Sequence, residues 1–302
     1  MVLPKIGQNI PDNGCQRWVF SCDFYVFLIP IFLILNPAAS IIIAFYNNIR
    51  NLRLVLAGLE RQTNTDFEII ITDDGSRADV VEEIKQIQRQ SKLTIRHLWQ
   101  PDNGWQKNVM LNKAVVAAQT DYLIFIDGDC IPDDRFVAEH LKSKTLGFAL
   151  CGRRVYLSDK ISKSLTPQIV GDNYFNRNYL KLFVTGQTRH GEKMIFARIP
   201  FIARYINSKH RDFWGCNFSI HKADLLAING FDERFVTPGI GEDIDVYRRL
   251  LLTGRSTKSV VATALVYHLD HKETQIPQAT YDLETITKQE TNPFTPFGID
   301  KK

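Results

Sequence analysis

In Tyr122-Leu-Ile-Phe-Ile-Asp-Gly-Asp129, an apolar run ends abruptly in two carboxylates separated by one glycine. A short run that is apolar at every position is typical of a strand buried on both faces of a sheet. Ligands of open α/β sheets collect at the carboxyl ends of such strands. The stretch therefore predicts a buried strand over residues 122–126, with a polar site directly after it.

Three further buried strands are predicted upstream, each followed by a helix. The strands are expected over Ser40–Phe45, Phe67–Thr72 and Leu93–Leu98, and the helices over Leu52–Leu59, Val80–Ile87 and Lys107–Ala118. Buried strands that alternate with helices indicate a largely parallel sheet with helices on both faces. We therefore expect a three-layer α/β fold.

Composition and charge limit the possible classes of protein. The chain has 302 residues, of which 44% are hydrophobic and 23% charged, as in an ordinary globular protein. A net charge of +4 without dense Lys/Arg runs argues against a nucleic-acid partner. The chain has five cysteines: Cys15, Cys22, Cys130, Cys151 and Cys216. Their number is odd and none are spaced as Cys-x-x-Cys, so they indicate neither a disulfide framework nor a zinc site. The cytoplasm is the expected compartment.

Residues 1–37 are predicted to be an apolar extension outside the catalytic fold. Trp18–Leu35 is strongly apolar but contains Asp23 and Pro30, so it falls short of the roughly 20 uncharged residues of a spanning helix. No small-residue cleavage pattern follows it. Two interpretations remain, peripheral contact with the inner face of a membrane and a buried or poorly ordered extension.

The strand–helix alternation is interrupted between about residues 152 and 212. This stretch is basic with interleaved aromatic residues, and it predicts an inserted region that is either a solvated helical lid or a surface for an anionic or sugar acceptor. Regular structure is expected again as a strand over Trp214–Ile220, a helix over Lys222–Ile228 and a helix from about Asp243 to Gly254. Residues 273–302 form a polar tail with no catalytic signal.

Asp127 and Asp129 project to the same side of the predicted strand, and Gly128 leaves room for a ligand between them. Two carboxylates without soft ligands suit Mg²⁺ or Mn²⁺. A turn that uses Asp only for local hydrogen bonds is the alternative. The position directly after a long buried strand favours the metal site.

A second acidic motif, Asp73-Asp74-Gly75-Ser76, follows the second predicted strand. It indicates either an ordinary turn or a nucleoside site, in which the carboxylate accepts a hydrogen bond from the base. Tyr46, at the end of the first strand, is placed to stack on such a base, and simple packing at the rim is its alternative.

Glu242 and Asp243 lie at the start of a predicted helix. The helix dipole would stabilise them there and lower their pKa values, whereas desolvation by a substrate and their mutual repulsion would raise one pKa toward that of a base. His268 follows a short apolar strand. It is either a packed residue or a further ligand of a metal held by Asp129.

Taken in order over about residues 39–272, these motifs resemble those of family 2 glycosyltransferases with the GT-A fold. The last three are similar to the C-terminal part of galactosyl- and N-acetylgalactosaminyltransferases, including bacterial chondroitin-polymerase-type domains. The matching segments are Tyr46-Asn47, Thr72-Asp-Asp-Gly-Ser76, Asn103-Gly104, Asp127-Gly-Asp129, Trp214-Gly-Cys-Asn-Phe-Ser219, Asn229-Gly-Phe-Asp232 and Gly241-Glu-Asp243. The resemblance implies a GT-A domain over residues 38–272, a nucleotide-sugar-binding fold with a mainly parallel mixed sheet.

On the donor side, the resemblance implies that Tyr46 and Asp74 hold a uracil-type base and that Asp127 lies by the ribose. Asp129 would coordinate Mn²⁺ or Mg²⁺ in an Asp-x-Asp motif, with His268 or His271 as a further ligand. Lys107 stands where many relatives have Arg, so it would contact phosphate or ribose as a point charge.

On the acceptor side, the resemblance implies that Asp243 is the general base and that Glu242 positions the acceptor or orients that base. Gly239-Ile240 replaces a tryptophan that often stacks on the acceptor in galactosyltransferases. Trp214 or Trp105 would then supply the sugar platform, and core packing is the alternative for either ring.

The implied activity is inverting, metal-dependent transfer from a UDP-sugar to a hydroxyl of a saccharide or glycolipid acceptor, in polysaccharide or glycoconjugate synthesis. Two other functions are alternatives. A nucleotidyltransferase would need a Gly-rich phosphate loop after Phe45, and the sequence has none there. A non-catalytic nucleotide-sugar-binding protein is disfavoured because Asp74, Asp129 and Asp243 occur together.

Overall fold

The computed structural model describes residues 37–209, 213–239, 241–272 and 275–301. The chain divides into two units, and the structure below is that of the second, Asn36–Lys302. Apart from Pro37, the N-terminal prediction for residues 1–37 lies outside the described residues. Among the described residues, no helix has the length and apolar character needed to cross a membrane.

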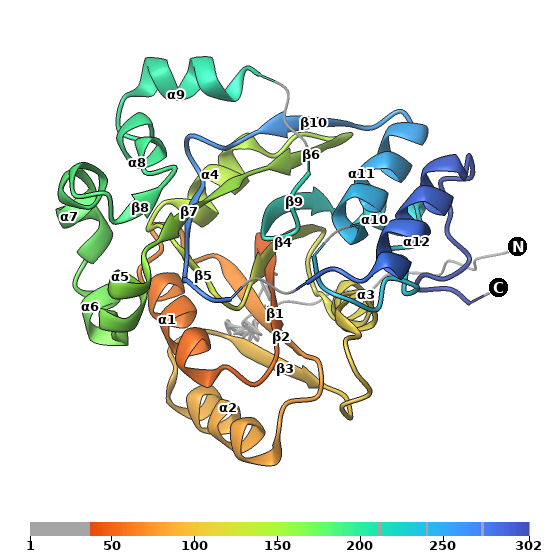
Figure 1. Cartoon of the computed structure of the whole chain (residues 1–302), viewed down its shortest axis with the longest axis horizontal. Coiled ribbons are helices and arrows are strands. Elements are labelled where there is room, and N and C mark those ends of the chain that lie inside the picture. The colour runs from red at the N-terminus through yellow and green to blue at the C-terminus, as the bar shows by residue number, and fades with distance from the viewer. Residues whose placement is uncertain (1–36, 210–212, 240, 273–274, 302) are drawn as a thin grey trace, which may run out of the picture. The chain divides into compact units, whose positions relative to one another are not determined.

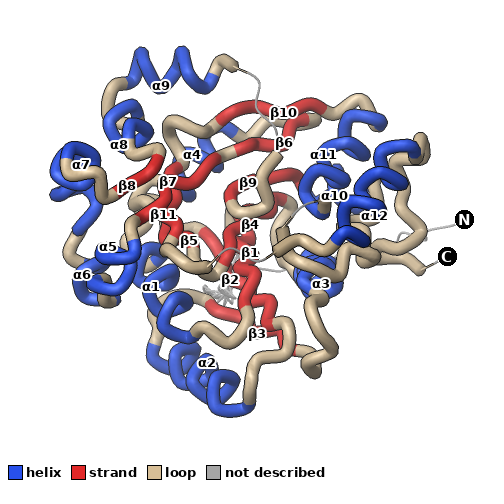
Figure 2. The backbone as a smooth tube through the Cα atoms, in the orientation of Figure 1, coloured by secondary structure: helices blue, strands red, loops and turns tan. Residues whose placement is uncertain are grey.

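A seven-stranded mixed sheet, in the order β10-β6-β9-β4-β1-β2-β3, forms the centre of this unit (Figures 1 and 2). Its strands are β1 (Ala39–Phe45), β2 (Phe67–Asp73), β3 (Ile95–Trp99), β4 (Tyr122–Asp127), β6 (Phe148–Cys151), β9 (Asn217–His221) and β10 (Ser256–Ser259). β1 pairs in parallel with β2 and β4, and β2 with β3, whereas β9 is antiparallel to β4 and β6. The predicted mainly parallel mixed sheet is therefore confirmed.

Helices cover both faces of this sheet. α1 (Ile49–Leu59), α2 (Ala78–Gln90) and α4 (Phe136–Ser143) share one buried cluster, and α3 (Lys107–Ala117), α10 (Lys222–Ala227) and α11 (Glu242–Leu252) share the other. The alternation of β1 explains both clusters, because Ile41 and Ile43 pack on the first face and Ile42 on the second. The fold has the three layers predicted from the sequence.

A second, four-stranded sheet has the order β5-β11-β7-β8. It contains β5 (Cys130–Pro132), β7 (Arg153–Leu157), β8 (Thr188–Arg189) and β11 (Leu265–His268). β11 runs parallel to β7 and antiparallel to β5. This sheet brings His268 opposite Cys130, beside the end of β4.

The predicted inserted region is largely helical. It contains α5 (Asp159–Ser164), α6 (Pro167–Gly171), α7 (Tyr174–Val184), α8 (Glu192–Phe196) and α9 (Pro200–Asn207). These helices are anchored to the second sheet, since the rings of Phe175 and Tyr267 stack with centroids 3.8 Å apart. The region thus shares a buried core with α1, β5 and β11.

The predicted polar tail contains α12 (Gln278–Gln289), which packs against α11. The side chain of Asn229 donates hydrogen bonds to the carbonyls of Thr295 (2.7 Å) and Asp300 (2.9 Å). Arg234 bridges Asp232 and Glu290 at 2.7 and 2.9 Å. Residues 275–301 are therefore tied to the domain along the face that carries α11.

Two predicted strands start later than expected, and one of them is β3, which begins at Ile95 instead of Leu93. The strand predicted from Trp214 begins at Asn217, because residues 214–216 form a turn closed by a hydrogen bond from Asn217 N to the Trp214 carbonyl (3.2 Å). That turn places Trp214 and Cys216 at the end of β4 instead of within the sheet.

Candidate functional site

A cavity of about 560 Å³ opens at the carboxyl ends of β1, β2 and β4. Its volume is within the roughly 300–1,000 Å³ of sites that bind small molecules. The predicted donor residues line it together: Tyr46, Asp74, Lys107, Asp127 and Asp129. Gly128 allows this gathering, because a Cβ there would lie 2.8 Å from the carbonyl oxygen of Ala44 on the neighbouring strand.

Asp74 is a fixed acceptor in the floor of this cavity. It is only 8% exposed, and its two carboxylate oxygens accept from Gln100 Nε2 (2.7 Å) and the Gln106 backbone N–H (2.6 Å). Burial raises the pKa of Asp74, although these two hydrogen bonds oppose the shift. Each oxygen retains a second lone pair for a ligand.

Tyr46 stands at the mouth of the same cavity and is 51% exposed. Its hydroxyl donates to Asp102 Oδ2 at 2.9 Å. The loop behind it is held by Asn47, whose backbone N–H donates to Ser76 Oγ (2.7 Å) while its side-chain oxygen accepts from the Arg77 N–H (3.0 Å). These bonds fix the spacing between the ends of β1 and β2, so the ring can stack on a planar group above Asp74.

Asp129, His268 and His271 converge at the end of β4. His271 Nε2 lies 3.2 Å and His268 Nε2 3.5 Å from Asp129 Oδ2, and the two imidazole nitrogens are 3.3 Å apart. Nδ1 of His268 is buried and has no hydrogen-bond partner in the described part of the chain. One carboxylate and two imidazoles that point at one another form a donor set that fits a divalent cation such as Mn²⁺.

Without a metal, a hydrogen bond between His271 and Asp129 holds this cluster together. Burial would raise the pKa of Asp129, but the hydrogen bond from His271 and the charges of both imidazoles outweigh it and lower the pKa to about 2. The hydrogen bond to Asp129 raises the pKa of His271 to about 9, whereas burial lowers the pKa of His268. A bound cation would take the place of the His271 proton.

A second cavity, of about 720 Å³, adjoins the first. The two share one wall, made of Trp105, Lys107, Asp127, Asp129 and His271. On the far side of this wall the second cavity is lined by Trp214, Asp243 and Tyr247. Within the wall, Lys107 Nζ lies 2.9 Å from Asp127 Oδ1. A ligand in either cavity therefore reaches the same carboxylates.

Asp243 projects from the first turn of α11 into the second cavity. The turn is possible because Gly241 has φ +107°, and a Cβ there would lie 2.2 Å from the Phe235 ring. Asp243 Oδ2 accepts from the Gly215 N–H and Oδ1 from the Ile244 N–H, both at 2.8 Å. Burial raises the pKa of Asp243 from its ordinary value of 3.8, against the opposing effect of these N–H groups and Lys107.

Two predicted acceptor-side residues are incompletely described. Glu242 begins α11, but its side chain and the whole of Ile240 lie outside the described residues. Trp214 lines the second cavity, yet its ring is already covered by a guanidinium, since Arg153 Cζ lies 4.4 Å and Arg154 Cζ 5.6 Å from the ring centroid. A sugar would meet this ring beside two cations.

Several residues of the site belong to none of the predicted motifs. Asp102 and Gln106 lie in the loop between β3 and α3 and act through Tyr46 and Asp74. Arg154 reaches the second cavity from β7. The Asn103-Gly104 motif pointed to the first loop. Nothing local marked Arg154, which is one of many basic residues in its region.

The mainly parallel mixed sheet, with polar cavities at its strand ends, is the GT-A fold of glycosyltransferases. The chain belongs to glycosyl transferase family 2, whose sequence model matches residues 40–222. A second family model, described as the N-terminal domain of galactosyltransferase, matches residues 201–272. The predicted family and enzyme class are thereby confirmed.

Two of the named relatives are polysaccharide synthases. The chain is 29% identical to a chondroitin synthase of Escherichia coli, over 87% of this chain and 39% of that protein. It is 30% identical to a hyaluronan synthase of Pasteurella multocida, over 76% of this chain and 24% of that protein. The chain thus spans well under half the length of these relatives.

Solved structures share the fold at low sequence identity. One is GalNAc-T7 with UDP, GalNAc and Mn²⁺, with a TM-score of 0.59, 14% identity, and coverage of 84% of this chain and 48% of that chain. Another is the mannosyltransferase PcManGT of Pyrobaculum calidifontis with GDP-Man and Mn²⁺, with a TM-score of 0.52, 14% identity, and coverage of 84% and 61%. These likenesses confirm the fold class.

Proposed function

We propose that this glycosyltransferase is inverting and metal-dependent, and that it moves a sugar from a UDP-sugar to a hydroxyl of a saccharide or glycolipid acceptor. The observation that carries the proposal is the shared wall between the two cavities. It joins a nucleoside-sized cavity to one that contains the half-buried carboxylate of Asp243. A sugar at the wall would be open to attack from the second cavity.

The first cavity is proposed as the donor site. Tyr46 would stack on the uracil ring, and Asp74 would accept from the ring N–H, a role that its two existing hydrogen bonds prepare by fixing the carboxylate. Asp127 would contact the ribose. Lys107, now paired with Asp127, would place a positive charge beside the diphosphate.

We assign Asp129 and His268 as ligands of the divalent cation and add His271, on the distances within that cluster. The imidazoles favour Mn²⁺ over Mg²⁺, which prefers oxygen ligands alone. When bound, the cation neutralises charge on the departing diphosphate.

The second cavity is proposed as the acceptor site. Asp243 would take the proton of the acceptor hydroxyl while that oxygen bonds to the anomeric carbon and the bond to the diphosphate breaks. One displacement without a covalent intermediate inverts the anomeric configuration. Burial supports this role, because it raises the pKa of Asp243 toward that of a base. Glu242 would position the acceptor, and Trp214 would contact its sugar ring.

The biological product is proposed to be a polysaccharide or glycoconjugate, on the similarity to bacterial chondroitin and hyaluronan synthases. We place the enzyme in the cytoplasm, where residues 1–37 either contact the inner face of the membrane or form a buried or poorly ordered extension. The apolar character of Trp18–Leu35 supports this contact.

Nucleotide release from a panel of sugar donors tests the proposal. Chelator-treated protein is assayed with UDP-sugars and matched GDP-sugars, with and without added Mn²⁺. We expect Mn²⁺-dependent release of UDP from at least one UDP-sugar, and loss of that release in Asp129→Ala. Binding of UDP without release from any donor would instead support a nucleotide-sugar-binding protein.

A further inference from the structure

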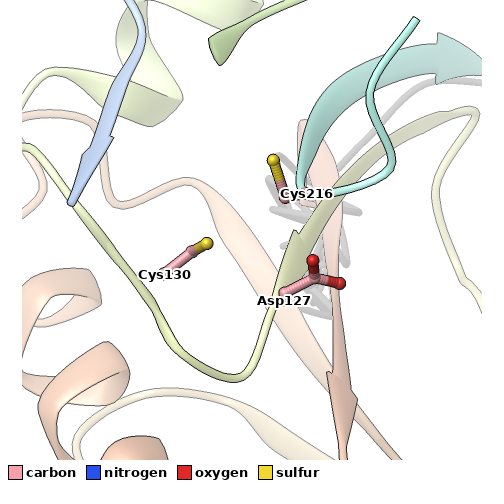
Figure 3. Close-up of side chains that lie close together, drawn as sticks. All are labelled: Asp127, Cys130 and Cys216. Atoms are coloured by element: carbon pink, nitrogen blue, oxygen red, sulfur yellow. The ribbon is translucent and has the colours of Figure 1, made fainter. Parts of the chain in front are cut away.

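Two buried thiols lie near the end of β4, and one of them, Cys216, lines the second cavity. Cys130 is the first residue of β5, and Cys216 lies in the turn before β9; their exposed fractions are 0% and 4%. Although they are far apart in the sequence, one ligand atom each of Asp127, Cys130 and Cys216 lie within 4.8 Å of one another. Figure 3 shows the three side chains gathered around the end of β4.

We propose that Cys130, Cys216 and Asp127 form a binding site for a thiophilic divalent cation, of which Zn²⁺ is the leading example. This site is different from the one assigned to Asp129, His268 and His271. Thiolates are soft ligands that select Zn²⁺ over Mn²⁺ and Mg²⁺. Binding would be a simple exchange in which Zn²⁺ enters and the two thiol protons leave to solvent, without any change of oxidation state.

The spacing of the three ligand atoms suits a small tetrahedral ion. Zn–S bonds of about 2.3 Å and Zn–O bonds of about 2.1 Å place the ligand atoms roughly 3.5–3.8 Å apart. Atoms that already lie within 4.8 Å of one another reach this arrangement by small side-chain movements. Two thiolates and one carboxylate leave one position of a tetrahedron for water or a fourth ligand.

A neighbouring imidazole strengthens the assignment. His268 offers a ring nitrogen within 4.8 Å of the Cys130 sulfur and of an Asp129 oxygen, and its buried Nδ1 has no hydrogen-bond partner among the residues described. Buried polar atoms normally have partners. The region around Cys130 therefore contains several atoms that can bind a metal, and one of its buried nitrogens has no hydrogen-bond partner among the residues described.

Packing alone is the usual role of a buried cysteine, and Cys151 shows the contrast. Cys151 is also buried, but it lies in the apolar cluster on the other face of the sheet and belongs to neither metal-like group of the described residues. The Cys130 sulfur instead contacts Asp129 Oδ1 at 3.4 Å. Cys151 is thus a natural control for the other two.

The site has a consequence that rests on the proposed function. Asp127 also lines the donor cavity and pairs with Lys107. A cation that holds Asp127 against the thiols would remove it from the ribose, so Zn²⁺ would compete with the donor. The cation site itself does not depend on this consequence.

Cobalt spectroscopy on the full-length reduced protein tests the site directly. Co²⁺ replaces Zn²⁺ and gives strong near-ultraviolet charge-transfer absorption only when thiolates bind it. We expect this absorption in wild type, its reversal by Zn²⁺, and its loss in Cys216→Ser and Cys216→Ala. Zn²⁺ affinity in these variants should fall by at least about tenfold, since loss of even a hydrogen-bond partner of a metal ligand has an effect of that size.

Three controls separate this site from other metal-binding groups. Cys151→Ser, and the double variant Cys15→Ser/Cys22→Ser, should keep the absorption. Asp129→Ala should also keep it, because Asp129 belongs to the other site. Circular dichroism melting of each variant shows that it is folded.

If the Co²⁺ spectrum of wild type has no thiolate charge-transfer band, the proposal is wrong. It is also wrong if the band persists in Cys216→Ser. Because these measurements use no sugar donor, their outcome does not depend on the proposed transferase activity. In the activity assay, we expect Zn²⁺ to raise the donor KM of wild type more than that of Cys216→Ala. If Zn²⁺ inhibits wild type and Cys216→Ala equally, Asp127 is not shared between the donor cavity and the cation site.

Discussion

The two cavities share a wall but are built in different ways. The donor cavity is formed largely by loops that directly follow β1, β2 and β4, and its key carboxylate, Asp74, is held by residues of the neighbouring β3–α3 loop. The acceptor cavity gathers residues from β7, the turn before β9, α11 and Ile276. Under the proposed function, donor recognition would therefore depend on strand ends, whereas acceptor recognition would depend on the packing of distant segments.

This difference predicts that changes on the acceptor side alter the chemical step while changes on the donor side alter donor binding. Asp243→Asn is expected to have the largest effect. It keeps the size of the side chain but removes the base, so kcat should fall by about 10²–10⁴-fold. Steady-state kinetics and UDP binding by calorimetry check this, with the UDP affinity unchanged. A kcat near the wild-type value would remove Asp243 from the mechanism.

The next largest effect concerns the stability of the acceptor side. Asp245 Oδ2 pairs with Arg249 Nε at 2.7 Å, and both side chains are at most 1% exposed. Asp245→Ala leaves the buried guanidinium without its carboxylate and should lower the free energy of unfolding by about 3–5 kcal/mol. Urea denaturation measures it. Asp282→Ala, at an exposed position of α12, is the control and should change stability by less than about 0.5 kcal/mol.

On the donor side, Asp74→Asn is expected to weaken UDP binding by about 10–100-fold, the range for loss of a hydrogen bond to a charged group. The kcat at saturating donor should stay close to that of wild type. Calorimetry with UDP and initial rates at high donor concentration separate the two effects. A variant that loses kcat but binds UDP normally would contradict the division between the cavities.

The pH dependence of kcat sharpens the same division. Because burial raises the pKa of Asp243 above its ordinary value of 3.8, the base becomes protonated at a higher pH than a free aspartate. We expect kcat to fall about tenfold per unit of pH once the pH is below that pKa. Rates measured with saturating donor and acceptor report it. If the residual kcat of Asp243→Asn falls at the same pH as that of wild type, the group that titrates is not Asp243.

The same contrast explains what could be predicted from the sequence. Asp74, Asp127 and Asp129 were found because apolar strands end directly before them, and β1, β2 and β4 place their carboxyl ends at one edge. Cys130 and Cys216 were set aside because spacing rules detect only ligands that are close in the sequence. Arg153 and Arg154 beside Trp214, and Ile276 in the acceptor cavity, depend on long-range packing. No local pattern encodes that packing.

The proposed reaction is a single displacement. In it, an acceptor oxygen activated by Asp243 attacks a sugar held beside the residues that the two cavities share. The anomeric configuration of the product tests this most directly, by proton NMR of the new linkage formed from an α-linked UDP-sugar that the enzyme accepts. Inversion gives a β-linked product. An α-linked product would require retention and would contradict it.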